Sequence, residues 1–180
     1  MEKPIFYCDC DGVIINTIEV SFKIMQEAGC NINNRSEVDA FFKSKIDWNK
    51  VFSKIDYINN SIEKLKLIKS QNIFKDVIIL TKLSGGYDEE RLKRDLFKEV
   101  LPDFKVITLQ YGLSKGLAVP AKDNILVDDE IGNCKSWEKE NGIAILFSPY
   151  MFNLETNIIN NLCDVTDTLG VKKLLKTRKI

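Results

Sequence analysis

The 180-residue chain contains no histidine, and this absence excludes several kinds of catalytic site. Without an imidazole group, neither a Ser-His-Asp triad nor a Cys-His pair can form. A zinc site is also disfavoured, because Cys8 and Cys10 are spaced more closely than paired zinc ligands usually are and no second pair follows them. If the chain is an enzyme, its chemistry must come from carboxylates, lysine, threonine and a metal ion.

The chain also lacks an excess of either charge and any long apolar run. Lys plus Arg number 26, as do Asp plus Glu, so no global field would recruit nucleic acid or an anionic membrane. No apolar run approaches the ~20 residues of a membrane span, and residues 1–4 leave no room for a signal peptide. The five cysteines lack disulfide-like spacing, which is typical of a reducing compartment. We therefore expect a cytoplasmic protein without a membrane partner.

Short apolar runs of strand length recur along the chain. They cover residues 5–7, 77–80, 106–109, 125–127 and 143–147. Several are continuously apolar, as expected for strands that are covered on both faces of a parallel sheet. Helical patterns separate them, for example the shared face of Leu92, Leu96 and Val100. This alternation predicts an open, doubly wound α/β fold with a parallel sheet.

The segment between the first two predicted strands has helical signals but no convincing strand. Ser36 and Asp39 resemble a capping box, and a further amphipathic face is marked by Ile58, Ile62, Leu65 and Ile68. Because the segment is too long for one crossover helix, we expect a small helical cap over residues 17–72, inserted into an α/β core of residues 1–16 and 73–180. From Asn153 onward the pattern predicts one or two closing helices. Ser84-Gly85-Gly86 predicts a flexible connector.

Acidic residues follow two of the predicted strands, at the edge where such sheets bind ligands. Asp9 ends the first strand, and a turn that Gly12 permits presents Asp11. Asp128 and Asp129 follow the fourth strand in the same way. So many negative charges are unfavourable together unless a cation neutralises them. Hard oxygen ligands without cysteine or histidine favour Mg²⁺ over zinc.

These motifs, taken in order, resemble those of the haloacid dehalogenase (HAD) superfamily of phosphotransferases. A hydrophobic strand precedes Asp9-Cys10-Asp11-Gly12-Val13, and then come Thr81, a lysine, and Asp128-Asp129. The resemblance covers the whole chain, with a cap between the first two motifs. The compact helical cap and the chain length are most similar to the 5′(3′)-deoxyribonucleotidase branch.

The resemblance implies a role for each matching residue. Asp9 would be the nucleophile that forms an aspartyl-phosphate, and Asp11 would be the general acid and base. Mg²⁺ would bind the Asp9 carboxylate, the Asp11 main-chain carbonyl and Asp129, with Asp128 in support. The Thr81 hydroxyl would hold the phosphate.

The superfamily also uses a lysine that balances the nucleophile and the phosphate. Lys115 follows the third predicted strand at a suitable distance, so we favour it. Lys122 lies in the short link before the fourth strand, and Lys82, beside Thr81, is a weaker third choice. The position of this lysine is left open between them.

The expected function is Mg²⁺-dependent hydrolysis of a small phosphate monoester, with nucleoside or deoxynucleoside monophosphates favoured as substrates. A phosphatase of a sugar phosphate or other small metabolite is the alternative, as is a catalytically silent HAD-fold binding protein. The balanced charge argues against a nucleic-acid-end phosphatase. The aromatic residues of the cap are expected to form its own core, and one or two of them could stack on a nucleobase; they are Phe41, Phe42, Trp48 and Phe52.

Overall fold

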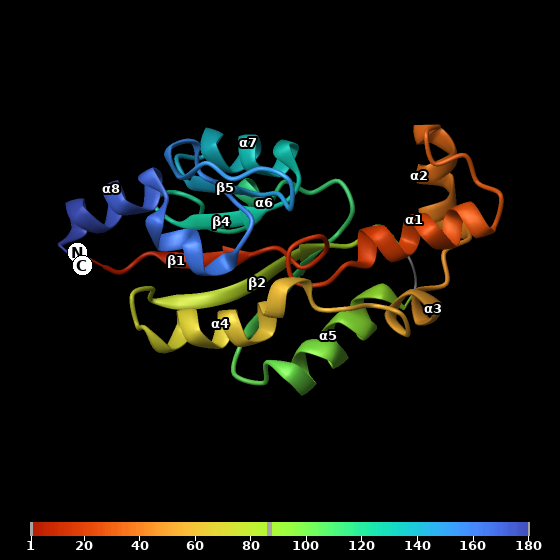
Figure 1. Cartoon of the computed structure of the whole chain (residues 1–180), viewed down its shortest axis with the longest axis horizontal. Coiled ribbons are helices and arrows are strands. Elements are labelled where there is room, and N and C mark those ends of the chain that lie inside the picture. Colours follow the sequence, from red (N-terminus) through yellow and green to blue (C-terminus); the bar gives the residue numbers. More distant parts are fainter. Residues whose placement is uncertain (1, 86–87, 180) are drawn as a thin grey trace.

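The computed structural model of the chain describes residues 2–85 and 88–179, so Gly86 of the predicted connector lies outside the described residues. Over this range the strands form one six-stranded sheet in the order β3-β2-β1-β4-β5-β6, and all neighbouring strands are parallel (Figure 1). The strands are β1 Ile5–Cys8, β2 Asp76–Lys82, β3 Lys105–Leu109, β4 Ile125–Asp128, β5 Ile143–Phe147 and β6 Ile158–Ile159. The predicted α/β class with a doubly wound parallel sheet is confirmed.

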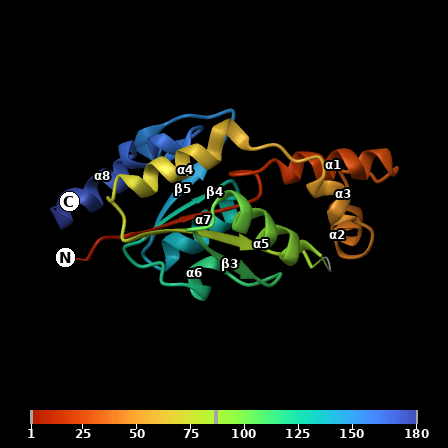
Figure 2. The ribbon, with the colours of Figure 1, turned by 90° about the horizontal axis from the view of Figure 1, so that it is seen from below.

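Helices lie on both faces of the sheet and beyond its carboxyl edge (Figures 1 and 2). The α-helices are α1 Thr17–Glu27, α2 Arg35–Ser44, α3 Trp48–Phe52, α4 Ser61–Ser70, α5 Glu89–Val100, α6 Lys115–Ala118, α7 Ile131–Lys139 and α8 Leu169–Arg178. Short 3₁₀ turns cover Ile58–Asn60, Leu154–Thr156 and Leu162–Asp167. Among the described residues, no helix combines the length and the apolar character that a membrane span requires.

The central strand β1 shows why the predicted strands are continuously apolar. Successive side chains of a strand point to opposite faces of the sheet. Phe6 and Cys8 pack in one core cluster with Leu65 of α4. Tyr7 packs in the other cluster, where its ring meets the edge of the Trp137 ring of α7 at a centroid distance of 5.2 Å. Both faces of β1 are therefore buried under helices.

Helices α1, α2 and α3 extend beyond the sheet and have a small core of their own (Figures 1 and 2). It consists of Val20, Ile24, Trp48 and Val51. The two chain segments that join these helices to the sheet lie side by side. The N–H of Asn16 donates to the carbonyl of Asp56 at 3.1 Å, and the N–H of Asp56 donates to Asn16 Oδ1 at 2.7 Å.

The start of α2 differs from the predicted capping box. The helix begins earlier than Ser36 and Asp39 indicate, because Asn34 is the N-cap residue. The Asn34 side chain accepts from the N–H groups of Ser36 and Glu37 and donates to Glu37 Oε1 at 2.9 Å. Glu37 does not complete a capping box, because its carboxylate accepts from the Asn34 side chain, whereas the Asn34 N–H donates to the carbonyl of Asn31.

Helix α4 packs against the sheet and not with the other three helices. Its Ile62, Leu65 and Ile68 belong to the main core cluster together with residues of β1 and β2. The division into residues 1–16 and 73–180 against 17–72 stays a prediction. The packing of α4 favours a cap that ends before Ser61.

The C-terminal segment is more than the closing helices predicted for it. Strand β6 pairs in parallel with β5, placing Ile158 beside Leu146. A strand of two residues is too short to produce a recognisable pattern in the sequence. The prediction of helices alone after Asn153 is therefore wrong for β6, whereas α8 follows as expected.

Candidate active site

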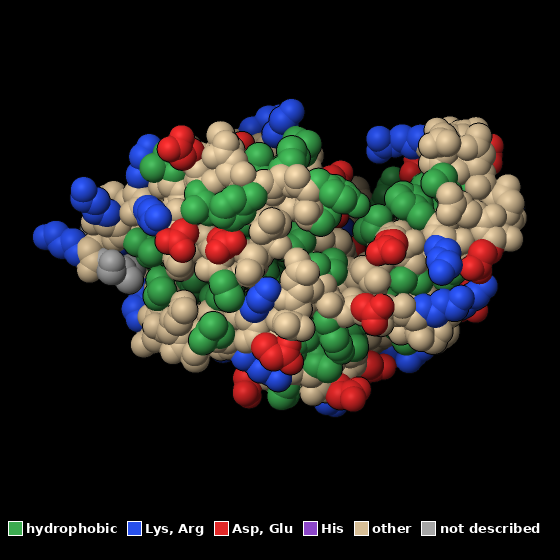
Figure 3. All heavy atoms as spheres, viewed as in Figure 1, with side chains coloured by type: hydrophobic (Ala, Val, Ile, Leu, Met, Phe, Trp, Pro, Cys, Tyr) green, Lys and Arg blue, Asp and Glu red, His purple; other side chains and the backbone are tan. Residues whose placement is uncertain are grey.

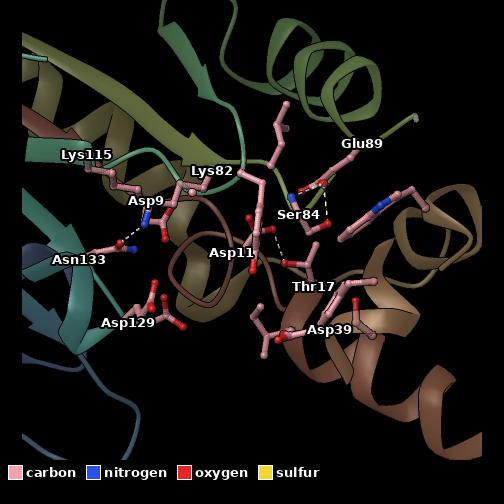
Figure 4. A pocket seen from close by; sticks show the side chains of 18 of the residues that line it. Asp9, Asp11, Thr17, Asp39, Lys82, Ser84, Glu89, Lys115, Asp129 and Asn133 are labelled. Carbon is pink, nitrogen blue, oxygen red and sulfur yellow. Dashed lines mark hydrogen bonds and ion pairs between the residues drawn. The ribbon is translucent and has the colours of Figure 1, made fainter. Parts of the chain in front are cut away.

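A cavity of about 510 Å³ lies between the carboxyl edge of the sheet and helices α1–α3. Figure 3 shows the surface hollowed between these helices and the main body, and Figure 4 shows the side chains around the hollow. Asp9 and Asp129 line the cavity from the sheet edge, whereas Phe42 and Trp48 line it from α2 and α3. The acidic strand ends therefore share one cavity with aromatic side chains.

Asp9 directly follows β1 and is held by both backbone and side-chain contacts. Its N–H donates to the carbonyl of Val127 at 2.9 Å, and its Oδ1 accepts from the N–H of Cys10 at 2.8 Å. Lys115 Nζ lies 2.7 Å from Asp9 Oδ1 and 2.6 Å from Asp128 Oδ2. The Lys115 side chain is fully buried at the start of α6. One buried lysine thus pairs with carboxylates from two neighbouring strands.

The other two lysines considered from the sequence lie elsewhere. Lys122 is exposed in the turn before β4 and does not line the cavity. Lys82 lines the cavity, but its Nζ donates to Asn133 Oδ1 and not to Asp9. Of these three lysines, Lys115 is therefore the one that pairs with Asp9, and its role as the superfamily's lysine stays a prediction.

Asp128 is completely buried and its carboxylate is fully hydrogen-bonded. Oδ1 accepts from the N–H of Glu130 at 2.9 Å and from Asn133 Nδ2 at 3.0 Å, while Oδ2 accepts from Lys115. Asn133 also lies beside Lys82, as Figure 4 shows for these two cavity-lining side chains. Asn133 was not predicted as a site residue; in the sequence it is only one polar residue of a helix.

Three carboxylates lie close enough to share a cation. One oxygen each from Asp9, Asp128 and Asp129 lies within 4.8 Å of the others. Asp129 approaches the turn after Asp9 so closely that a Cβ on Gly12 would be 2.1 Å from Asp129 Oδ2. Such a set of hard oxygen donors fits Mg²⁺. Among the described residues the cluster includes no cysteine, because Cys8 and Cys10 pack in the hydrophobic core.

The protonation equilibria of these carboxylates reflect their crowding. Burial raises the pKa of Asp9 well above its usual range, and Asp128, Asp11 and Asp129 raise it further, while Lys115 opposes them. Burial and the charge of Asp128 raise the pKa of Asp129 to about 7. A bound divalent cation would favour the ionised carboxylates and release protons. The donor set is therefore one that a cation stabilises.

The Asp11 side chain points away from this cluster and into a second polar network. Its Oδ1 accepts from Thr17 Oγ1 at 2.5 Å, and its Oδ2 accepts from Lys93 Nζ at 2.5 Å and from Thr81 Oγ1 at 3.2 Å. Burial disfavours the ionised carboxyl, but Lys93 and the hydrogen bonds outweigh burial and lower the pKa of Asp11. The structure thus brings Thr81 to Asp11; phosphate binding by Thr81 stays a prediction.

Lys93 is the centre of this second network and was not predicted. It is fully buried on α5, and besides Asp11 it contacts Thr81 Oγ1 at 3.0 Å and Glu89 Oε1 at 2.8 Å. Glu89 in turn accepts through Oε2 from the N–H and Oγ of Ser84 at 2.7 and 2.8 Å. This network connects α5 and the segment after β2 to the carboxylate of Asp11.

The sequence does contain a signal for Lys93, although a weak one. Glu89, Lys93 and Phe97 lie four residues apart and form the buried stripe of α5. In the sequence the first two look like an ordinary surface ion pair at i and i+4. The apolar residues Leu92 and Leu96 each precede Lys93 and Phe97 by one position, so they indicate that the neighbouring face of the helix is the buried one. Only the alignment with Phe97 marks the charged pair as buried.

Comparison with known proteins identifies the fold. No family model and no curated protein matches the chain. Among solved structures, a HAD-superfamily hydrolase of subfamily IA from Geobacter sulfurreducens superimposes with a TM-score of 0.59 at 12% identity, covering 93% of this chain and 100% of that chain. The HAD-hydrolase YfnB from Bacillus subtilis, bound to magnesium, gives 0.61 at 12% identity, with 94% and 100% covered.

A HAD phosphatase from Thermococcus onnurineus is similar to the same extent. Its TM-score is 0.57 at 14% identity, with 93% of this chain and 98% of that chain covered. The chain therefore has the Rossmann-like fold of the HAD-superfamily hydrolases, and the resemblance drawn from its motifs is confirmed at the level of the fold. The deoxyribonucleotidase branch stays a prediction.

Replacing Gly12 should impair both stability and cation binding. In Gly12→Ala the new Cβ would displace Asp129, and the positive φ of 74° would add strain of about 1–2 kcal/mol. Gly29→Ala is a matched control, because Gly29 has φ of 77° and open space where a Cβ would lie. We expect Mg²⁺ to raise the unfolding temperature of the wild type and of Gly29→Ala but not of Gly12→Ala. Equal Mg²⁺ responses of the two variants would contradict the proximity of Asp129.

Removing Lys93 should leave two buried carboxylates without their counter-charge. In Lys93→Met the free energy of unfolding should fall by about 3–5 kcal/mol, the usual cost of breaking a buried ion pair by removing one partner. Arg91→Met on the same helix loses only exposed ion pairs and should cost less than about 1 kcal/mol. Urea denaturation measures both variants. Similar losses would show that the Lys93 network contributes little to stability.

Asp129 should make the metal-free protein less stable as the pH rises. Its pKa increases from an ordinary value of 3.8 to about 7 on folding, so its contribution to stability is present at low pH and is lost as pH rises through 7. Asp129→Asn carries no charge at any pH. In EDTA its unfolding temperature should therefore exceed that of the wild type by more at pH 8 than at pH 5. Added Mg²⁺ should make the wild type more stable than Asp129→Asn at pH 8. A difference in unfolding temperature that does not change with pH would contradict the raised pKa of Asp129.

Proposed function

We propose that the chain is a Mg²⁺-dependent phosphomonoester hydrolase that acts through an aspartyl-phosphate on Asp9. The observation that carries this proposal is the environment of Asp9. It is fixed at the strand end, pairs with Lys115 at 2.7 Å, and lies within a cluster of three carboxylates in the same cavity as Asp11. The HAD hydrolase fold and the phosphatase and magnesium-bound structures among its neighbours support it.

In the first step an oxygen of the Asp9 carboxylate attacks the phosphorus, and the bond from phosphorus to the leaving alcohol breaks. Asp11 donates a proton to the oxygen of that alcohol. Lys115 stabilises the negative charge that Asp9 and the phosphoryl group share. The carboxylates of Asp9 and Asp129 and the main-chain carbonyl of Asp11, with Asp128 in support, would hold Mg²⁺, whose positive charge would stabilise the phosphoryl oxygens.

In the second step water attacks the phosphorus of the aspartyl-phosphate, the bond to the Asp9 oxygen breaks, and phosphate leaves. Asp11 takes the proton from that water. The contacts that lower the pKa of Asp11, from Lys93, Thr17 and Thr81, favour the ionised form that this step requires. In the first step the negative phosphate of the substrate would favour the protonated form.

We propose nucleoside or deoxynucleoside monophosphates as the substrates. The cavity of about 510 Å³ has room for more than a phosphate group, and Phe42, Trp48 and Tyr111 line it. Aromatic rings can stack on a nucleobase with about 1–3 kcal/mol each. The cysteines of the described chain are all unpaired thiols, which supports the proposed cytoplasmic location.

The nucleophile can be tested with purified protein, Mg²⁺ and p-nitrophenyl phosphate. Asp9→Asn should lower kcat by about a thousandfold or more, because the amide cannot form the covalent intermediate. Asp103→Asn, at an exposed residue remote from the cavity, should retain wild-type activity. Equal rates for wild type and Asp9→Asn, or no hydrolysis by either, would overturn the proposal. A panel of nucleotides and sugar phosphates then identifies the substrate; turnover of sugar phosphates alone would overturn the nucleotide assignment.

A further inference from the structure

Two polar atoms of the helical cap are buried without a hydrogen-bond partner. They are Ser21 Oγ on α1 and Trp48 Nε1 on α3, and within residues 2–85 and 88–179 no other buried side-chain nitrogen or oxygen lacks a partner. The two residues are only 1% and 5% exposed. An unpaired buried donor destabilises a folded protein, and native structures contain few. These two atoms therefore require an explanation.

Both residues line the cavity that contains Asp9 and Asp11. They also lie in the same part of the cap, since Val20 and Ile24 of α1 pack in one cluster with Trp48. Around the Trp48 ring the neighbours are apolar: the Phe42 ring stacks at 6.2 Å and the Phe52 ring meets it edge-on at 6.3 Å. These aromatic neighbours offer no oxygen or nitrogen acceptor, so the indole N–H is free to donate to an acceptor on a ligand.

The chemistry of the two groups limits what that ligand is. An indole N–H can only donate a hydrogen bond, while a hydroxyl can donate or accept. A group that satisfies both must offer an acceptor, such as a carbonyl oxygen or a ring nitrogen. The aromatic and aliphatic surroundings favour a flat, largely apolar ring as the carrier of that acceptor.

We infer that Ser21 and Trp48 determine substrate specificity by donating hydrogen bonds to an acceptor atom on the ring of the leaving group. The inference rests on the proposed function, because it assumes a phosphate monoester as the substrate. It places the leaving group of that ester at the cap end of the cavity. Both donors are covered in the free protein, so a rotation of the Ser21 side chain or a small shift of the five-residue helix α3 accompanies binding. Binding breaks no hydrogen bond within the protein, since neither donor has a protein partner.

A matched pair of ligands isolates this acceptor. Thymidine 5′-monophosphate carries ring carbonyls, whereas the 5′-monophosphate of the difluorotoluene deoxynucleoside has nearly the same shape and very weak acceptors. Calorimetry with the Asp9→Asn protein and Mg²⁺ measures both dissociation constants without hydrolysis. Thymidine monophosphate should bind about tenfold more tightly, and Ser21→Ala or Trp48→Phe should each lower this ratio by about three- to tenfold, as expected for loss of one hydrogen bond.

The chain offers controls with the same substitutions at partnered sites. Trp137 Nε1 donates to the carbonyl of Asn124 at 3.2 Å, and Ser61 Oγ donates to the carbonyl of Ile14 at 2.8 Å. Trp137→Phe and Ser61→Ala should lower the unfolding temperature and leave the ligand ratio unchanged. Ser21→Ala should leave the unfolding temperature of the free protein unchanged or raise it, since it removes an unpaired polar atom. Trp48→Phe leaves a small cavity as Trp137→Phe does, but it breaks no hydrogen bond and should lower the unfolding temperature less than Trp137→Phe.

Equal binding of the two ligands by the unsubstituted cap would overturn the inference, and so would a ratio that neither substitution changes. Failure of either ligand to bind would also overturn it. The rate with p-nitrophenyl phosphate reports on the proposed function separately. If the protein hydrolyses this ester but binds the two nucleotides equally, the proposed phosphatase function stands and the specificity role of Ser21 and Trp48 is wrong.

Discussion

The compensation of buried negative charge by buried lysines is the interaction on which the site depends. Four aspartates meet at one edge of the sheet, and two of them, Asp9 and Asp128, are almost inaccessible to water. Charges in such a place are stable only if they are paired and hydrogen-bonded. Lys115 pairs with Asp9 and Asp128, and Lys93 pairs with Asp11. Lys93 comes from α5, which packs against β3, and Lys115 comes from α6, which packs against α7, so the packing of the helices and the arrangement of the site are coupled.

The two lysines also separate the aspartates into groups with different chemistry. Burial and the neighbouring carboxylates raise the pKa values of Asp9 and Asp129, and a cation is the natural counter-charge. The carboxylate near Lys93 has enough hydrogen bonds to stay ionised without a metal. Residues two apart in the chain, Asp9 and Asp11, thus differ because the strand and the following turn direct them to different partners.

The sequence was sufficient to predict the sheet and the acidic cluster because their signals are local. Continuous apolar runs identified the first five strands, and strand ends located Asp9, Thr81 and Asp128. Lys93 was missed because its burial depends on how α5 is rotated, which only packing decides. Strand β6 was missed because it exists through pairing with β5 and not through its own two residues. Likewise, the unpaired state of Trp48 Nε1 is a property of the assembled cap, whereas the aromatic content of the cap was visible in advance.

The adjacency of Asn16 and Asp56 has a consequence for how proteins of this architecture diversify. Because the chain leaves the sheet and returns to it at neighbouring points that are tied together by two hydrogen bonds, the intervening helices form an exchangeable module. Lengthening, shortening or replacing that module changes one wall of the cavity while leaving the strands that carry the carboxylates in register. The two walls of the cavity can therefore vary independently within one polypeptide.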